Sequence, residues 1–157
     1  MKLMMNGAVT LGTLDGANVE IAAATGMENQ YIFGLNTNEV DELWRNGYSS
    51  SSFYHSSPVL KKVIDRLYSP IGGQDFSHIA DYLVNASYGI SDPYMCLADF
   101  DSYLHAYKCA IKDHAKIDVW SRKSLINTGA SGIFSSDVSI KKYADEIWKI
   151  SPIKEIK

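Results

Sequence analysis

Apolar side chains recur every three or four positions through most of the chain after residue 57. This spacing places them on one face of a helix, so each stripe predicts an amphipathic α-helix. The clearest helix is expected to begin at Ser57 as cap with Pro58 in its first turn, and to end near Ser69 and Pro70. The stripes comprise Val59, Leu60, Val63, Ile64 and Leu67; Phe76, Ile79, Ala80, Leu83 and Val84; Tyr103, Leu104, Tyr107 and Ile111; Trp120, Leu125 and Ile126; and Ile140, Tyr143, Ala144, Ile147 and Trp148.

An earlier helix is predicted by its boundary residues. Asn36 followed three residues later by Glu39 is typical of a capping box, in which each residue's side chain bonds the other's backbone N–H. Asn46 and Gly47 form a typical helix end, because glycine readily takes the left-handed conformation there. Residues 47–57 are rich in serine and are expected to form a loop with some irregular helix.

Short polar residues ahead of the later stripes predict the caps of those helices. Asp99 or Asp101 is expected to cap the stripe that begins at Tyr103. Asp118 is expected to cap the next helix, and Ser135 or the following serine the last one. Trp148 falls on the apolar stripe of that last helix, so we expect its side chain to be buried.

The first 33 residues carry a different pattern. Residues 9–11 are β-prone and are followed by Gly12, and residues 31–33 are short, aromatic and β-branched, so both predict strands. Between them Asp15 can cap a helix that stops at Gly26. A strand, a helix and a strand within about 25 residues are typical of one βαβ unit with parallel strands.

Two strands are too few for the helices that follow. Parallel strands are normally buried on both faces, and a sheet needs more than two strands to be stable by itself. The sequence therefore predicts an α/β chain, mostly helical, with two short parallel strands. We interpret it as the end of a doubly wound α/β domain whose beginning is missing.

Composition narrows the class of protein. The chain has 157 residues, 46% apolar side chains and a formal net charge of −3, which suits a single globular domain over residues 1–157. It has no run of Lys or Arg, so nucleic-acid binding is not expected. No apolar run approaches the roughly 20 residues of a membrane helix. Cys96 and Cys109 are too few for a disulfide framework and are expected to be reduced thiols of a cytoplasmic protein.

Lys2 followed by an apolar run is the arrangement that begins a secretory signal. Polar residues and glycines, such as Asn6, Thr10 and Gly12, interrupt that run, whereas a signal needs an unbroken apolar stretch. Secretion is therefore not expected.

Two clusters could carry chemistry by composition. His105, Cys109 and Asp113 are spaced four apart on one predicted helix face, a spacing that suits zinc ligands. A structural zinc site needs four ligands, so an ordinary half-exposed helix face is the better interpretation and no metal is expected. Five carboxylates offer acid–base chemistry, but all lie near predicted helix N-termini, where capping and the helix dipole explain them. They are Glu39, Asp41, Glu42, Asp99 and Asp101.

The glycines of residues 12–16, read G-T-L-D-G, lie between a predicted strand and a helix, where phosphate-binding glycines belong. They lack the G-x-G-x-x-G pattern, so a tight turn is the default interpretation. Lys2 by itself is an ordinary solvated lysine near a chain end. From spacing alone, neither feature indicates a function.

A resemblance to a known family makes Lys2 a candidate functional residue. The segment "MKLMMNGAVTLGTLDGANVEI" closely resembles the region around the cofactor lysine of the glycogen (α-glucan) phosphorylases. Further along, "ENQYIFGL" resembles the family's E-N-x-x-I-F-G strand and "RNGY" its R-G-Y turn. "LADFDSYL" resembles its F-x-V-x-x-D-F-x-x-Y segment, although Met95 and Cys96 replace the usual residues before it. The end, "ASGIFSSDVSIKKYADEIW", is similar to the family's A-x-S-G-x-F-S-S-D-x-T-I-x-x-Y-A-x-E-I-W. The resemblance covers essentially the whole chain.

By that resemblance Lys2 is the lysine that forms a Schiff base with pyridoxal phosphate. The family's cofactor phosphate acts as a proton donor and acceptor towards inorganic phosphate, which releases terminal α-1,4-linked glucose of a glucan as glucose 1-phosphate. Asn6, Gly7, Asp15, Gly16 and Asn18 match the motif and are expected to serve packing and turn geometry near the site.

The resemblance implies part of the C-terminal domain of a GT-B-type glycosyltransferase, a Rossmann-like fold, with Met1 an interior methionine. The complete enzyme is expected to be a cytoplasmic homodimer, and this chain alone to be inactive without its N-terminal part. Two alternatives stay open: a non-catalytic phosphorylase-derived domain with a binding or structural role, and an unrelated α/β phosphate- or nucleotide-binding module.

Overall fold

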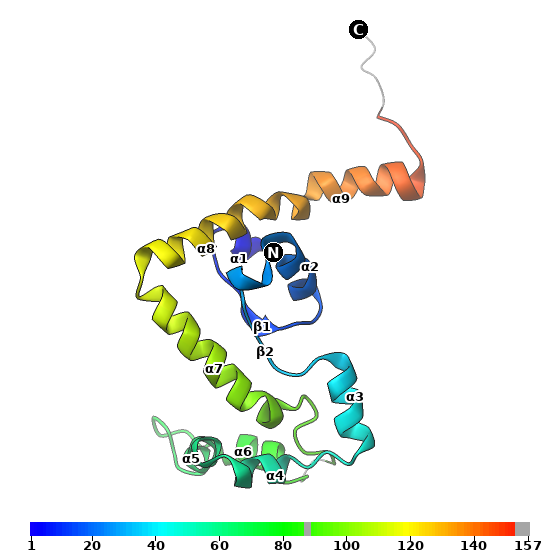
Figure 1. Ribbon diagram of the computed structural model, residues 1–157. Coiled ribbons are helices and arrows are strands. Elements are labelled where there is room, and N and C mark those ends of the chain that lie inside the picture. Colours follow the sequence, from blue (N-terminus) through cyan, green and yellow to red (C-terminus); the bar gives the residue numbers. More distant parts are fainter. Residues whose placement is uncertain (87–88, 153–157) are drawn as a thin grey trace. The chain divides into compact units, whose positions relative to one another are not determined.

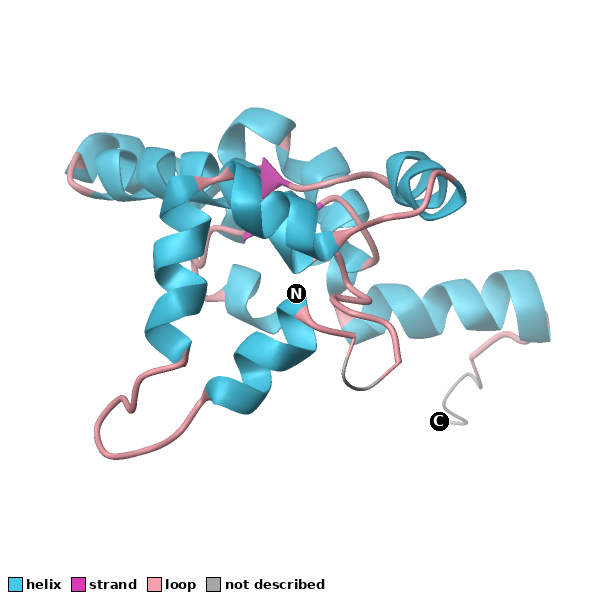
Figure 2. Cartoon of the chain, turned by 90° about the horizontal axis from the view of Figure 1, so that it is seen from below, coloured by secondary structure: helices cyan, strands magenta, loops and turns pink. Residues whose placement is uncertain are grey.

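The computed structural model describes residues 1–86 and 89–152, and the chain divides into two compact units. Unit 1 contains Met1–Thr10, Gly16–Gln30 and the chain from Asp113 onward, and unit 2 contains Leu11–Asp15 and Tyr31–Lys112. Figure 2 shows that helices dominate the described chain and that the strands are two short segments. Within the described residues, no helix is both long and apolar enough to span a membrane.

Unit 1 is built around one long helix. Its elements are α1 (Lys2–Met5), α2 (Ala17–Thr25), η1 (Met27–Asn29), α8 (Ile117–Ala130), η2 (Ser131–Phe134), α9 (Ser136–Lys142) and the π-helical η3 (Tyr143–Trp148). Helices α1, α2 and η1 all contact α8, and α1 and α2 lie beside it in Figure 1. Met4, Ile21 and Ala22 are buried on these elements.

Unit 2 joins the strand pair to a helical cluster. Its elements are β1 (Leu11–Thr13), β2 (Tyr31–Phe33), α3 (Thr37–Arg45), α4 (Ser50–Ser56), α5 (Pro58–Leu67), α6 (Ser77–Val84) and α7 (Cys96–His114), whose last two residues belong to unit 1. Helices α4, α5 and α6 pack on one another. Their core is formed by Leu60, Ile64, Ala80 and Leu97, the last from the first turn of α7.

The two strands are parallel, as predicted, with Leu11 opposite Tyr31 and Thr13 opposite Phe33. The second strand has its predicted position, whereas the first begins two residues later than residues 9–11. Gly12, expected to end that strand, lies in its middle and pairs with Ile32. In unit 1, the N–H of Thr10 donates to the side-chain Oε1 of Gln30 at 3.0 Å, so the backbone at Thr10 is engaged by a side chain instead of a strand partner.

Three predicted caps are confirmed. Asn36 accepts from the N–H of Glu39 and the Glu39 side chain accepts from the N–H of Asn36, which is a complete capping box. Ser57 accepts from the N–H of Leu60 at the start of α5, and Ser135 caps α9 in the same way. The predicted helix end at Asn46 and Gly47 is also confirmed, with Gly47 at a φ of 79°.

Three other caps were predicted wrongly. Gly16, not Asp15, is the N-cap of α2, and Lys116, not Asp118, is that of α8, and neither makes a side-chain capping bond. Helix α7 begins at Cys96, before Asp99 and Asp101. Its first turn is bonded instead by the buried Asp92, whose Oδ1 accepts from the N–H of Cys96 at 2.9 Å and whose Oδ2 accepts from the N–H of Leu97 at 2.8 Å.

Two further expectations need correction. The serine-rich stretch contains a regular helix, α4, with Ser50 buried and its hydroxyl donating to Ser91 at 2.9 Å. Trp148 is 53% exposed, not buried, and its ring contacts that of Tyr143 at 5.8 Å between centroids. The apolar stripe exists on α9 and η3, but Ile140 and Ile147 are exposed with it.

Candidate functional site

Lys2 lies in the first turn of α1, a helix of a single turn at the start of unit 1. Its side chain is exposed, whereas Met4, two residues later, is buried and anchors the turn in the core. The backbone carbonyl of Lys2 accepts a hydrogen bond from the side-chain amide of Asn6 at 2.8 Å. Asn6 thus closes the turn, in agreement with its predicted role in local geometry.

The chain leaves this turn through a Schellman motif. Gly7 has a φ of 83°, the left-handed region that glycine occupies without a Cβ penalty. The N–H of Gly7 donates to the carbonyl of Met4, and the N–H of Ala8 donates to that of Leu3, both at 3.0 Å. This pair of bonds is the signature of the motif and fixes the path of the chain after α1. Residues 2–8 therefore form one hydrogen-bonded piece.

Gly7 is also the point where this piece meets α8. A Cβ on Gly7 would lie 2.5 Å from the Oγ of Ser124, closer than any real Cβ contact. The predicted packing role of Gly7 is therefore confirmed. Its φ disfavours any other residue, and a side chain here would also displace the hydroxyl of Ser124.

One turn further along α8, Asn127 is fully buried and lies in a network of side-chain amides. Its Oδ1 accepts from the Nε2 of Gln30 at 2.7 Å. Its Nδ2 donates to the backbone carbonyls of Asn29 at 3.2 Å and Lys123 at 2.9 Å. Gln30 also donates to the Oγ1 of Thr25 at 2.8 Å, so the network joins α8 to the end of α2 and to η1.

This network was not predicted from the sequence. Gln30 and Asn127 are 97 positions apart, and neither lies in a periodic pattern that identifies a buried polar residue. The only signal is the pair of amides at Asn29 and Gln30 immediately before a predicted strand, where apolar residues are expected. Through its Oε1, Gln30 binds the N–H of Thr10 and thereby holds the segment that follows Gly7.

The remaining motif residues lie at the start of α2 and just before it. Gly16 is its N-cap, with a φ of 45°, which confirms a role in turn geometry. Asp15 is exposed, and Asn18 is half-buried in the first turn of α2. The described contacts give residues 12–16 a place in β1 and a turn, and nothing in them distinguishes a phosphate site.

In unit 2 the five carboxylates do not form an acid–base pair. Asp99 Oδ1 accepts from the N–H of Leu35 at 2.8 Å, and Asp101 accepts from the hydroxyl of Ser57 at 3.2 Å. Burial raises the pKa of Asp99 and the nearby negative charges of Asp92 and Glu39 add to the rise, while the N–H of Leu35 opposes it. Each carboxylate thus has a structural partner or an exposed position on α3.

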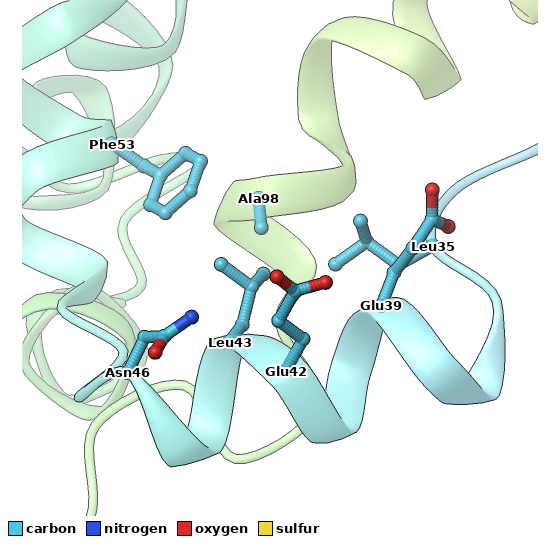
Figure 3. Close-up of a pocket in the computed structure, with 7 residues that line it drawn as sticks. All are labelled: Leu35, Glu39, Glu42, Leu43, Asn46, Phe53 and Ala98. Carbon is cyan, nitrogen blue, oxygen red and sulfur yellow. The ribbon is translucent and has the colours of Figure 1, made fainter.

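A hollow of about 330 Å³ lies beside α3 (Figure 3). Glu39, Glu42 and Leu43 project from α3, Asn46 follows as its C-cap, and Phe53 of α4 and Ala98 of α7 lie opposite. The remaining lining residue is Leu35. Its walls are mainly apolar and the two glutamates are exposed, so the arrangement provides no buried polar group for a reacting ligand.

The predicted zinc-like set is spread along α7. The Sγ of Cys109 and the Nε2 of His105 are 3.7 Å apart, and Asp113 approaches the Nζ of Lys123 at 4.0 Å. In residues 1–86 and 89–152, no three His, Cys, Asp or Glu side chains gather as metal ligands would. Both cysteines are free thiols, and burial followed by the charge of Asp92 raises the pKa of Cys96.

The structure is thus that of an α/β chain in which the first helical turn carries an exposed lysine. Hydrogen bonds hold this turn together, and it packs against α8. The family model for carbohydrate phosphorylase matches residues 1–150, so the chain belongs to the carbohydrate phosphorylase family.

Curated relatives agree along nearly the whole chain. Glycogen phosphorylase of Synechocystis is 37% identical over 153 residues, and that of Haemophilus influenzae is 38% identical over 158 residues. Each alignment covers 98% of this chain. The brain form of human glycogen phosphorylase is 37% identical over 156 residues, 97% of this chain. The chain spans only 18–19% of the length of these relatives.

Proposed function

We propose that this chain, residues 1–157, is the C-terminal part of the C-terminal domain of an α-glucan phosphorylase, with the Rossmann-like architecture of GT-B glycosyltransferases. The observation that carries the proposal is the match to glycogen phosphorylases over 97–98% of the chain but only 18–19% of their length. The complete enzyme would release terminal α-1,4-linked glucose from a glucan as glucose 1-phosphate. Its partners would be the glucan, inorganic phosphate and a second subunit in the cytoplasm.

Exposed apolar side chains support the view that further polypeptide completes the fold. In unit 1, Leu3, Ile117 and Leu125 are 76%, 74% and 72% exposed. Burying a leucine or isoleucine side chain is worth about 1.5–3 kcal/mol, so surfaces of this kind normally lie against other parts of a protein. The pair of three-residue strands in unit 2 similarly offers few of the contacts that a stable parallel sheet needs.

We propose that Lys2 is the attachment point of pyridoxal phosphate. The cofactor's aldehyde needs a primary amine, which Lys2 presents on the exposed side of α1. When bound, the cofactor supplies a phosphate group that can donate and accept a proton. The Lys2 turn fits the covalent part of this requirement, because Asn6 and the Schellman bonds hold the lysine backbone in place.

The phosphate group of the cofactor needs donors besides Lys2. Backbone N–H groups at a helix start can hold a phosphate, but α1 is a single turn, and Asn6 and Ser124, the side chains beside the Lys2 turn, are uncharged. We therefore assign the phosphate donors, and the residues that hold glucan, to the part of the enzyme outside this chain. The 157-residue chain alone is accordingly expected to catalyse no phosphorolysis.

Borohydride reduction followed by peptide mapping tests the assignment in the complete enzyme. Reduction should fix one pyridoxyl group per subunit on the peptide that contains Lys2. A Lys2→Arg enzyme should lose the adduct and the activity, whereas Lys62→Arg, which changes an exposed lysine of α5, should retain both. A stoichiometric adduct on another lysine would overturn the assignment.

The same chemistry applied to the isolated chain tests the inactive-fragment proposal. We expect pyridoxal phosphate to label its exposed lysines without preference for Lys2, and no glucose 1-phosphate to form. A stoichiometric adduct on Lys2 in the isolated chain, or glucose 1-phosphate made by it, would contradict this proposal.

A second candidate function is that of a non-catalytic domain derived from a phosphorylase. It is also consistent with a chain that spans only 18% of its relative's length. The genomic sequence separates the two candidates. An open frame that continues upstream of Met1 into the rest of a phosphorylase supports the enzyme, and a stop codon there supports the non-catalytic domain.

A further inference from the structure

One face of α8 lies against Gly7 directly and is linked to Thr10 through Gln30. Ser124, Asn127 and Thr128 are spaced at i, i+3 and i+4 and so lie on that face together. Ser124 faces Gly7 at the end of the Lys2 turn. Asn127 binds Gln30, which in turn binds the N–H of Thr10. One direct contact and one link through Gln30 thus connect α8 to the residues immediately after α1.

A side chain on Gly7 would meet the hydroxyl of Ser124 before any other group. A Cβ on Gly7 would lie 2.5 Å from Ser124 Oγ but 3.8 Å from Ser124 Cβ and 3.7 Å from Thr128 Oγ1. The hydroxyl of Ser124 is therefore the one group closer than van der Waals contact to a Cβ at this position, and it would have to move to admit one. The hydroxyl of Thr128 is engaged with the backbone carbonyl of Ser124 at 3.0 Å.

Displacement at Gly7 would be transmitted to Lys2. The bonds from Gly7 to Met4, from Ala8 to Leu3 and from Asn6 to Lys2 join these residues into one piece, and Met4 is buried against the core. A packed element of this kind moves as a body, because protein interiors have little free volume.

We infer that Ser124 and Asn127 of α8 are positioning residues for the Lys2 amine: Ser124 sets the distance of its turn from α8, and Asn127, through Gln30 and Thr10, sets the direction in which the chain leaves it. This inference rests on the proposed role of Lys2. Displacement of a reacting group by about 1 Å can lower a rate about a hundredfold, so such residues matter even though they touch no substrate.

The test is a double-mutant cycle between Gly7→Ala and Ser124→Ala. Both Gly7→Ala variants carry the same cost of an alanine at a positive φ, but only the single variant also carries the clash with the Ser124 hydroxyl. In the 157-residue chain, hydrogen exchange of the Ala8 amide should be faster in Gly7→Ala and should slow again when Ser124→Ala is added. We expect the two changes to be non-additive by about threefold or more.

The wild type, the two single variants and the double variant can also be compared in the complete enzyme, where bound pyridoxal phosphate is the probe. Gly7→Ala should shift the absorbance and fluorescence of bound pyridoxal phosphate and lower kcat with little change in KM, and Ser124→Ala should restore a large part of both. Asn127→Asp, which keeps the size of the side chain but removes its two donated hydrogen bonds, should shift the spectrum in the same sense.

A control separates positioning from loss of stability. Leu60→Ala removes a buried side chain from the core of unit 2, so it should lower stability while leaving the cofactor spectrum unchanged. Additive effects in the cycle, or a wild-type spectrum in Gly7→Ala and Asn127→Asp, would overturn the inference. Mapping of the reduced adduct away from Lys2 would instead overturn the proposed function, independently of the outcome of the cycle.

Discussion

The Nε2 of Gln30 donates a hydrogen bond to the Oδ1 of Asn127 at 2.7 Å, between side chains that are 5% and 0% exposed. The nitrogen and the oxygen of both amides have partners: Asn127 donates to two backbone carbonyls, and Gln30 donates also to Thr25 and accepts from the N–H of Thr10. A buried polar network in which every group has a partner favours one arrangement, because any other arrangement leaves unpaired groups. Within unit 1, this pair therefore ties α8 to Gln30 and, through Gln30, to Thr10.

Replacing Asn127 with alanine should lower stability clearly. The change leaves Gln30 Nε2 with fewer acceptors and the carbonyl of Asn29 without its donor, and each unsatisfied buried group costs about 1–3 kcal/mol. We expect the free energy of unfolding to fall by about 2–4 kcal/mol in urea titrations. Asn38→Ala, an exposed asparagine of α3, is the matched control and should change it by about 0.5 kcal/mol or less. Equal effects would show that the network carries little stability.

The stability of the chain should depend strongly on which residue replaces Asp92. It is 1% exposed, has a φ of 45°, and accepts from Cys96, Leu97 and the hydroxyl of Tyr48. Asp92→Ala removes all three bonds and places alanine at a positive φ, so unfolding should become easier by about 3 kcal/mol or more. Asp92→Asn keeps an acceptor and tolerates that φ, so it should cost clearly less, and thermal unfolding can rank the two.

A similar loss for Asp92→Ala and for Asp137→Ala, an exposed acid in the first turn of α9, would contradict the proposed capping role of Asp92.

Asp99 predicts a pH dependence. Burial raises its pKa, so folding favours its protonated form. Its contribution to stability is therefore present below the ordinary carboxyl pKa and is lost as the pH rises through the raised value. Asp99→Asn keeps an acceptor for the N–H of Leu35 but cannot ionise. As the pH is raised from about 3 to about 7, the stability of Asp99→Asn should fall less, or rise more, than the stability of the wild type.

Urea midpoints at several pH values measure this difference, with Asp101→Asn, which changes an exposed acid two residues further along α7, treated in parallel. Identical pH profiles for the wild type and Asp99→Asn would contradict the prediction.

Replacing Leu60 with alanine should lower stability more than replacing Trp148, although tryptophan is the larger residue. Trp148 is 53% exposed and Leu60 is 2% exposed. In the 157-residue chain, Trp148→Ala should cost no more than about 1.5 kcal/mol, the value of an aromatic pair such as its contact with Tyr143. Leu60→Ala should cost about 2–5 kcal/mol. Denaturation of both variants checks the order, and a larger loss for Trp148→Ala would mean that its ring is buried.

Much of the local structure could be predicted because its causes are local. The bonds that cap α3, α5 and α9 join residues three positions apart, so Asn36, Ser57 and Ser135 could be identified from short patterns. The second strand could be identified from a β-branched and aromatic triplet before a glycine at Gly34. The apolar stripes likewise follow from helix periodicity, which depends only on neighbouring residues.

Predictions failed where the backbone path or a distant residue decides the outcome. The first turn of α7 is bonded by Asp92, which lies four residues before Cys96 and has a left-handed φ of 45°, and not by Asp99, which lies inside the helix. Asp99 instead binds the N–H of Leu35, which is 64 positions away. The stripe that contains Trp148 marks which face of the helix is apolar, but only packing decides whether that face is covered, and Trp148 is exposed.

For the candidate site, the sequence by itself determined the family, through motifs that extend over the whole chain, and it singled out Lys2 and Gly7 within them. Only the tertiary structure decided what holds the Lys2 turn: the Ser124 hydroxyl against Gly7, and Asn127 bound to Gln30. The physical reason is that hydrogen bonds and close packing depend on distances in space. Residues brought together from positions about a hundred apart leave no periodic trace in the sequence, whereas a cap or an amphipathic stripe does.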